Sequence, residues 1–207
     1  IQINGSVLYK LDTYGQLAFP KPGIAADVAI LLRSSNGKVL LVGILRKEPP
    51  AKGKLALIGG FRDIHGLHLQ SGIETAIAEV KQEIGVTLKP DQRYERIITT
   101  EPYYHSVPVA VTFYRSSLRY KSELFLLGSF YSSDTEKVNG SKMKRVYETV
   151  AYGLMIDIGN LSARDLSAYF SAQDDAKEVI LRNINRVHFP LAHHEKIFQA
   201  ARKKFHV

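Results

Sequence analysis

Apolar residues recur at helical spacing between Ser71 and Gly85. They stand at i, i+4, i+7 and i+11, the spacing of one buried helical face: Ile73, Ile77, Val80 and Ile84. Ser71 and Glu74 have the spacing of a capping box, in which each side chain satisfies a backbone N–H at the helix start. Gly85 can end a helix in the left-handed conformation. The pattern therefore predicts a helix between Ser71 and Gly85 with one face in the core.

Two near-continuous apolar runs precede this helix, at residues 24–32 and 38–45. The dipeptide Asn36-Gly37 lies between them and favours a tight hairpin turn. Strands that are apolar on both faces are typical of a sheet covered by helices on either side. We therefore expect two paired strands at the centre of such a sheet.

Other short runs rich in β-branched and aromatic residues predict further strands. They lie at residues 55–58, 97–100, 107–114, 124–131, 146–155 and 179–184. The polar residues 132–144 are expected to form a loop, and residues 161–171 a short helix. Residues 1–23 are expected to form an N-terminal extension of hairpin and turn. Because no repeat or long linker divides the chain, we expect a single domain over residues 1–207.

Glu79 and Glu83 place two carboxylates on the helix face opposite the apolar stripe, and Gln82 lies in the same arc of about 100°. Like charges at i and i+4 repel by roughly 0.2–0.5 kcal/mol, so the pair is unfavourable without a cation between the carboxylates. Mg²⁺ prefers oxygen ligands and keeps several waters, which suits an exposed carboxylate face. The alternative is an ordinary solvated helix face. The glycine pair Gly59-Gly60 favours a site, because glycine lets the backbone approach a ligand closely.

Residues 57–86 resemble the Nudix box, whose pattern is G, five residues, E, seven residues, then R-E-U-x-E-E-x-G-U with U apolar. The second half matches at Glu79, Val80, Glu83, Gly85 and Val86. It departs at Ala78, where the family has arginine, and at Gln82, where the family has a glutamate. The box is therefore recognisable and degenerate.

The first half of the box carries an insertion of four residues, which we place within residues 64–69. Gln70 then stands where the family has its first glutamate. The resemblance implies that the carbonyl of Gly60 and the carboxylates of Glu79 and Glu83 hold Mg²⁺ or Mn²⁺. The central ligand of the family is missing.

Residues 174–197 are similar to the ending of Nudix proteins of the ADP-ribose type, including related regulators of NAD metabolism: D-D-A, a strand, L-A-F-D-H, then a helix. Leu181 stands where a tryptophan is usual, and Ala-His precedes His194 in place of Phe-Asp. The resemblance covers roughly residues 24–205 and implies a last helix against the sheet. Adjacent helix residues diverge by about 100°, so we do not expect His193 and His194 to share a metal ion.

The resemblance implies a Nudix-like α/β/α sandwich with a mixed β-sheet. It also implies a pyrophosphohydrolase that cleaves a nucleoside diphosphate linked to another moiety, with ADP-ribose as the first candidate. Glu79 would be a metal ligand or the base, and Glu83 a ligand. The metal ions would neutralise charge developing on phosphorus while a carboxylate takes a proton from the attacking water. Because the base of this family is not always on the box, other carboxylates are candidates: Asp63, Asp174, Asp175 and Glu178.

A basic loop at residues 46–54 precedes the glycine pair. Arg46 and Lys54 are expected to contact the diphosphate, and Asp63 is the third expected substrate-binding residue. A solvated loop is the equal alternative, since basic loops serve either role.

The rival function is a Nudix domain that binds a nucleotide or RNA without cleaving it, as a sensor or scaffold. The absence of the box arginine and of the central glutamate is what such a domain would show. Removing support around a site typically costs 10–100-fold in activity or metal affinity, which leaves room for a weak enzyme.

Amino-acid composition does little to choose between the hydrolase and the binding domain. The formal net charge of +8 and the pI near 9.5 favour anionic partners such as nucleotides, diphosphates or RNA. The absence of cysteine excludes disulfides and thiolate zinc sites. No apolar run approaches the roughly 18 residues of a membrane span, so we expect no membrane partner and a cytoplasmic location. A homodimer is compatible with these features.

Overall fold

The structure is a computed structural model that describes the backbone of residues 2–3, 6–7, 10–11, 17–18, 24–48, 51–62, 64–65, 68–91, 108–138 and 141–207. Side chains are described at residues 25–48, 51–62, 70–91, 108–131 and 147–207. The strand predicted at residues 97–100 and the candidate Asp63 lie outside the described residues.

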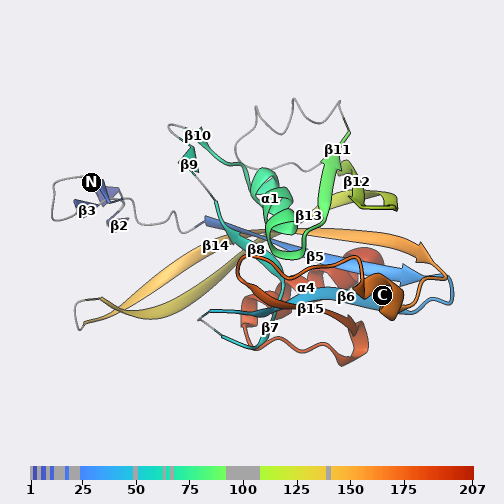
Figure 1. Cartoon of the computed structure of the whole chain (residues 1–207). Helices are drawn as coiled ribbons and strands as arrows, with labels where there is room; N and C mark the ends of the chain where they lie inside the picture. Colours follow the sequence, from blue (N-terminus) through green and yellow to red (C-terminus); the bar gives the residue numbers. More distant parts are fainter. Residues whose placement is uncertain are drawn as a thin grey trace.

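A mixed sheet of nine strands forms the centre of the fold (Figure 1). The strands follow the order β11-β12-β13-β14-β5-β6-β15, with β7 paired to β6 and β8 paired to β5. Their bounds are Ile24–Ser34 (β5), Val39–Arg46 (β6), Leu55–Ala56 (β7), Ile58–Phe61 (β8), Thr87–Pro90 (β11), Val109–Arg115 (β12), Leu118–Val138 (β13), Ser141–Gly159 (β14) and Ala176–Asn183 (β15). Within this sheet β14 runs parallel to β5, and the other described pairs are antiparallel.

Shorter elements complete the described chain. They are the antiparallel pairs β1 (Gln2–Ile3) with β2 (Ser6–Val7), β3 (Lys10–Leu11) with β4 (Leu17–Ala18) and β9 (Ile64–His65) with β10 (His68–Leu69), the helix α3 (Ala163–Ser167) and the 3-10 turn η1 (Ile184–Arg186). Helix α3 lies inside the segment predicted to be helical. None of the described helices is both long enough and apolar enough to cross a membrane.

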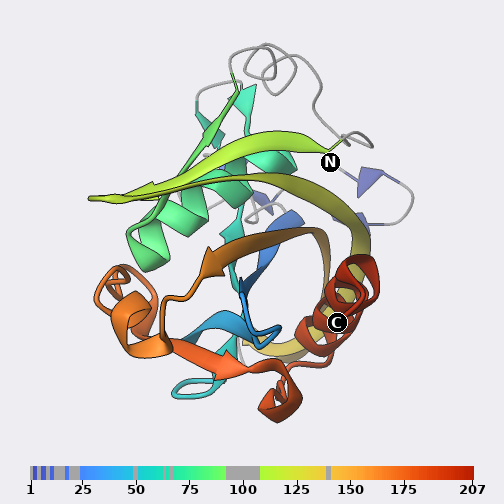
Figure 2. The same cartoon turned by 90° about the vertical axis from the view of Figure 1, so that its right-hand side faces the viewer.

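Alternate residues of β5 supply two hydrophobic layers, because successive strand residues face opposite sides of a sheet. Val28 and Ile30 pack in the layer that contains α1 (Gly72–Ile84). Ala29 and Leu31 pack in the layer that contains α4 (Ala192–Phe205). The two helices lie on opposite sides of β5 in Figures 1 and 2. The predicted arrangement of a mixed sheet between helices is confirmed.

Helix α1 begins and ends where the sequence predicts. The Ser71 side chain accepts from the backbone N–H of Glu74 at 3.2 Å, and the Glu74 carboxylate accepts from the backbone N–H of Ser71 at 2.7 Å. Gly85 follows the helix with a φ of 68°. Ile73, Val80 and Ile84 of the apolar stripe are buried, and Ile77 is partly buried. Local spacing therefore specifies this helix.

The prediction of a loop at residues 132–144 is wrong. Strands β13 and β14 continue through it, and their ladder reaches the pair Val138 and Ser141. From the pair Ser132 and Tyr147 outward, β13 and β14 pair only with each other among the described strands and form the ribbon that extends to the lower left in Figure 1. A two-stranded ribbon that projects from a sheet needs no continuous apolar face, so its polar sequence resembled a loop. The Asn-Gly dipeptide at positions 139–140 was the overlooked hairpin signal.

Substituting Gly85 by alanine should destabilise the fold more than the same change at Gly37. Both glycines have a left-handed φ, which costs an L-residue about 1–2 kcal/mol. A methyl group at Gly85 would also press on the guanidinium of Arg115 and on Ser171, whereas nothing lies within 4 Å of one at Gly37. Urea unfolding of both variants would measure the difference. Equal losses would show that the Arg115 side chain moves aside without cost.

Candidate functional site

The glycine pair lies on β8, where Gly59 stands opposite Asp27 of β5. A methyl group at Gly59 would overlap the Asp27 carboxylate, and one at Gly60 would overlap the carboxylate of Glu79. Since neighbouring strand residues face opposite sides, Asp27 approaches from the α4 side and Glu79 from the α1 side. Both carboxylates come this close to the backbone because neither position carries a side chain.

Glu83 lies next to the backbone of β8. Its Oε2 accepts a hydrogen bond from the backbone N–H of Gly59 at 2.9 Å, and the residue is 1% exposed. Burial raises the pKa of Glu83 to about 9, although the hydrogen bond from Gly59 lowers it. The expectation of an exposed carboxylate is therefore wrong for Glu83. Helical spacing places it on the polar arc, but the adjacent edge of β8 covers that part of the helix.

The other box residues of α1 that were singled out are more exposed to solvent than Glu83. Glu79 is partly buried beside Gly60, whereas Gln82 is exposed and Ala78 is partly buried. The structure thus places Glu79 and Glu83, both from α1, beside the two glycines in the middle of β8, next to the third proposed metal ligand, Gly60.

A cavity of about 480 Å³ opens on the α4 side of β8, the strand that carries Gly59 and Gly60 and is called the glycine strand below. Its lining comes from four places in the chain: Ala25, Asp27 and Arg46 from β5 and β6, Gly59, Gly60 and Phe61 from β8, Tyr131, Tyr147 and Thr149 from β13 and β14, and Pro190, Leu191, Ala192, His193, His194 and Lys196 around the start of α4. Glu79 and Glu83 lie on the other side of the strand and are not part of this lining. The glycine backbone therefore separates the cavity from the box carboxylates.

One part of the cavity wall is rich in hydrogen-bond donors. The Nε of Arg46 is buried and has no hydrogen-bond partner among the described residues. Lys196 lines the cavity, and so does the start of α4, whose N-cap residue Leu191 gives no side-chain cap. Uncapped N–H groups and the helix dipole favour an anion at this end. The wall therefore suits a phosphate group.

Lys54 is not part of this wall. Its carbonyl accepts from the backbone N–H of Arg46 at 3.0 Å, but its side chain is exposed and does not line the cavity. Of the two basic residues expected to bind substrate, the structure places only Arg46 in the cavity.

A second part of the wall is aromatic. The rings of Phe61 and Tyr147 have centroids 5.3 Å apart, and Tyr131 lines the cavity with 64% of its surface exposed. Exposed tyrosine rings next to a phosphate-binding surface can stack on a nucleotide base.

His193 and His194 lie much closer together than the sequence argument allowed. Their ring centroids are 4.3 Å apart, and they place ligand atoms within 4.8 Å of one another and of an Asp27 oxygen. Side chains in a helix lean back over the preceding turn. His193 and His194 stand in the first turn of α4, where no preceding turn constrains their side chains, so the two rings can approach each other. The prediction that they diverge is wrong.

Hydrogen bonding decides what His194 can do. Its Nδ1 accepts from the backbone N–H of Leu57 at 3.3 Å, so the proton of the neutral ring is on Nε2. That Nε2 lies 3.6 Å from Oδ2 of Asp27. Burial lowers the pKa of His194 well below its usual value, and the neighbouring His193 and Arg46 lower it further. A metal ion bound at Nε2 would require the proton on Nδ1, against the N–H of Leu57, so His194 does not suit a metal ligand.

Asp27 is the site residue that sequence reasoning missed. It is 5% exposed and lines the cavity, whereas the base candidates Asp174, Asp175 and Glu178 are exposed and lie outside it. Burial raises the pKa of Asp27 to about 7, although Arg46 lowers it. The available signal was a single acidic residue within the apolar run at residues 24–32.

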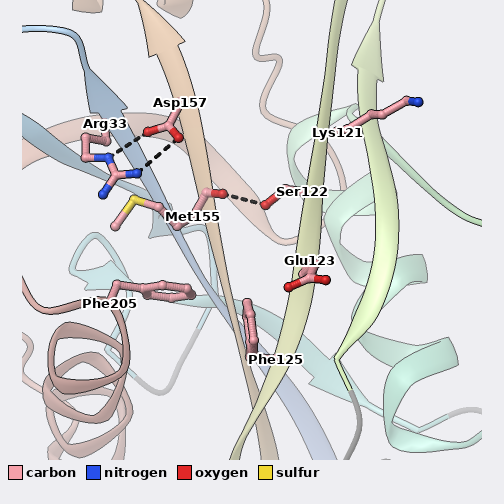
Figure 3. Close-up of a pocket in the computed structure, with 8 residues that line it drawn as sticks. All are labelled: Arg33, Lys121, Ser122, Glu123, Phe125, Met155, Asp157 and Phe205. Atoms are coloured by element: carbon pink, nitrogen blue, oxygen red, sulfur yellow. Dashed lines mark hydrogen bonds and ion pairs between the residues drawn. The ribbon is translucent and has the colours of Figure 1, made fainter.

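A second cavity, of about 360 Å³, is shown in Figure 3. Two of its charged residues, Arg33 and Asp157, satisfy each other. Arg33 donates to both carboxylate oxygens of Asp157, at 2.6 and 3.0 Å, and the Ser122 hydroxyl donates to the carbonyl of Met155 at 2.5 Å. None of its lining residues belongs to the glycine site. The cavity beside the glycine strand is therefore the stronger candidate.

Comparison with solved structures identifies the fold. The Nudix domain of Shewanella oneidensis NrtR, crystallised with ADP-ribose, superposes with a TM-score of 0.52 at 15% identity, covering 91% of both chains. S. oneidensis NrtR in complex with a 27mer DNA gives a TM-score of 0.50 at 14% identity, covering 88% of this chain and 62% of that longer one. No protein-family model and no curated protein sequence matches. The chain therefore has a Nudix-like fold, as its box-like sequence predicted.

Replacing Glu83 by glutamine should flatten the pH dependence of stability between pH 7 and 8.5. The pKa of folded Glu83 is raised to about 9, whereas a glutamate free of its surroundings has a pKa of 4.5. The folded state therefore holds one more proton in this range, and stability falls by about 1.4 kcal/mol per pH unit as pH rises. Asp27 adds to the slope only below its pKa of about 7.

Urea unfolding of both proteins at several pH values, without divalent metal, would measure the two slopes. Equal slopes would mean that Glu83 is already ionised at pH 7.

Proposed function

We propose that this chain binds a nucleoside diphosphate derivative, with ADP-ribose as the first candidate, in the cavity beside the glycine strand. The observation that carries the proposal is the buried Nε of Arg46, which has no hydrogen-bond partner in the described part of the chain. Leaving a buried donor unsatisfied costs about 1–3 kcal/mol, and more for a charged group. An anionic ligand in the cavity removes that cost.

Other features of the wall support the same ligand class. The uncapped start of α4 and Lys196 lie beside the cavity and favour phosphate oxygens. Tyr131 and Tyr147 offer rings for a base. The S. oneidensis domain of similar fold is bound to ADP-ribose, which makes that nucleotide the natural first probe.

Hydrolysis is the second candidate function, and the position of Glu79 beside the Gly60 backbone favours it. A carboxylate and a backbone carbonyl are ligand types that Mg²⁺ accepts, with waters completing its shell. When bound, the ion would polarise the diphosphate. Glu83, however, is buried and already accepts the N–H of Gly59, and Gln82 supplies no charge. We therefore rank binding above catalysis.

Arg46→Ala should weaken ADP-ribose binding by roughly 10–100-fold, the range expected when a hydrogen bond to a charged group is lost. It should also flatten the salt dependence of the affinity. Titration calorimetry at two salt concentrations would measure both effects.

Lys54→Ala provides the matched control, because this neighbouring basic side chain is exposed and outside the cavity. Its affinity should stay close to that of the unchanged protein. A larger loss at Lys54 than at Arg46 would move the ligand to the loop. Binding of single-stranded RNA with a steep salt dependence, and no binding of ADP-ribose, would favour the RNA-binding alternative.

For the hydrolytic function, the double variant Ala78→Arg, Gln82→Glu should raise kcat/KM for ADP-ribose with Mg²⁺ at least roughly tenfold, equal to about 1.4 kcal/mol. Glutamate at position 82 adds a carboxylate one residue from Glu83, at an exposed position where the fold can accept it. A coupled phosphatase assay would detect the products. Adding Glu83→Gln should abolish the gain. A protein that is inactive before and after these changes is a binding domain alone.

A further inference from the structure

The Asp27 carboxylate lines the cavity and has no hydrogen bond to any described residue. Its side chain is 8% exposed, and Nε2 of His194 lies 3.6 Å from its Oδ2, which is beyond hydrogen-bond distance. Its Oδ1 faces the backbone of Gly59. A buried acceptor without a donor is costly, so the cavity favours a ligand that donates hydrogen bonds to Asp27.

The order of the strands places Asp27 in the middle of the cavity floor. The sheet runs β13-β14-β5-β6 across this region. Tyr131 and Tyr147 belong to β13 and β14, Asp27 belongs to β5, and Arg46 ends β6. All four residues line the cavity. Asp27 therefore lies between the aromatic part of the wall and the buried guanidinium of Arg46.

Small residues surround Asp27 on its face of the sheet. Ala25 and Ala29 stand two positions away on β5, a spacing that keeps them on the same face. Ala151 of β14 is its partner on one side, and Gly59 of β8 is its partner on the other. No large side chain of these sheet neighbours shields the carboxylate, so a ring-shaped group of a ligand can approach it.

A nucleotide presents its groups in the same order as the cavity floor. The ribose joins the base to the phosphate and so always lies between them. With the base at the tyrosines and the phosphate at the unsatisfied Nε of Arg46, the ribose comes next to Asp27. Its 2′ and 3′ hydroxyl groups are adjacent donors, and an ionised carboxylate has two acceptor oxygens.

We propose that Asp27 accepts hydrogen bonds from the 2′ and 3′ hydroxyl groups of the nucleoside ribose and thereby selects ribonucleotides over nucleotides that lack these groups. This inference rests on the proposed binding of a nucleoside diphosphate derivative in the same cavity. It adds a specificity-determining residue and names the part of the ligand that this residue recognises.

The test compares ADP-ribose with an analogue whose adenosine ribose lacks both hydroxyl groups. Titration calorimetry at pH 8 keeps Asp27 mostly ionised, since burial raises its pKa only to about 7. The unchanged protein should bind the analogue at least about tenfold more weakly, which is the ratio expected when a hydrogen bond to a charged acceptor is lost.

Two substitutions of Asp27 should reduce this preference by different amounts. Asp27→Ala removes the acceptor and should leave a preference of about twofold or less. Its affinity for the analogue should stay the same or rise, because a negative charge near the diphosphate is removed. Asp27→Asn keeps a neutral acceptor oxygen and should retain a preference of roughly threefold, since a hydrogen bond to a neutral group is about half as strong.

Glu123→Ala provides the control, because it removes a carboxylate that is exposed and lines the second cavity instead. It should alter neither affinity. Thermal unfolding shows which variants are folded at the assay temperature. If Asp27→Ala does not fold, Asp27→Asn decides the question alone, and a preference as large as that of the unchanged protein overturns the inference.

The remaining outcomes distinguish this inference from the proposed function. If the unchanged protein binds ADP-ribose and the analogue equally well, the role of Asp27 is overturned and nucleotide binding stands. An equal loss of affinity for both ligands in Asp27→Ala also overturns the inference, because Asp27 would then support the cavity as a whole. Binding of neither ligand overturns both the proposed function and the inference.

Discussion

The close approach of side chains to the backbone of β8 is the constraint on which the site depends. Asp27 presses on this strand from the α4 side and Glu79 from the α1 side, while Glu83 holds the N–H of Gly59. A side chain larger than hydrogen at either glycine would separate these groups from the strand. The two hydrophobic layers of the fold therefore meet, at this strand, in a polar contact instead of an apolar one.

This contact concentrates unfavourable electrostatics in one place. Glu83 and Asp27 are both buried acids whose pKa is raised by burial; Asp27 raises the pKa of Glu83 further, and Arg46 lowers the pKa of both. The second cavity shows the opposite arrangement, since Arg33 and Asp157 satisfy each other through two hydrogen bonds. Groups left unsatisfied inside a folded protein are typical of sites prepared for a ligand, at some expense of stability.

Features governed by near neighbours in the sequence were predictable. The capping box at Ser71, the left-handed Gly85 and the buried face of α1 all follow from spacing within one helix. The paired strands β5 and β6 follow from apolar runs around Asn36-Gly37. Each of these depends on residues a few positions apart, which one sequence displays directly.

The parts of the site that were missed depend on contacts across the fold. Glu83 appeared exposed because helical spacing does not show that β8 covers it. His194 bonds to Leu57, 137 residues earlier in the chain, and no local pattern reports such a pair. Asp27 stands within an apolar run and belongs to no motif, so its place in the site becomes visible only from its position opposite Gly59.

The distance along the chain between these partners has a consequence for how the protein is made. The ribosome delivers β5 and β8 early, but the imidazole that lies next to Asp27 belongs to α4, which follows the whole sheet in sequence. Until α4 docks, Asp27 lacks both the neighbouring imidazole of His194 and one wall of the cavity. The nascent chain can therefore complete the α1 layer of its core before its binding site, and an intermediate that lacks docked α4 would contain the sheet and α1 yet be unable to bind a ligand in the cavity.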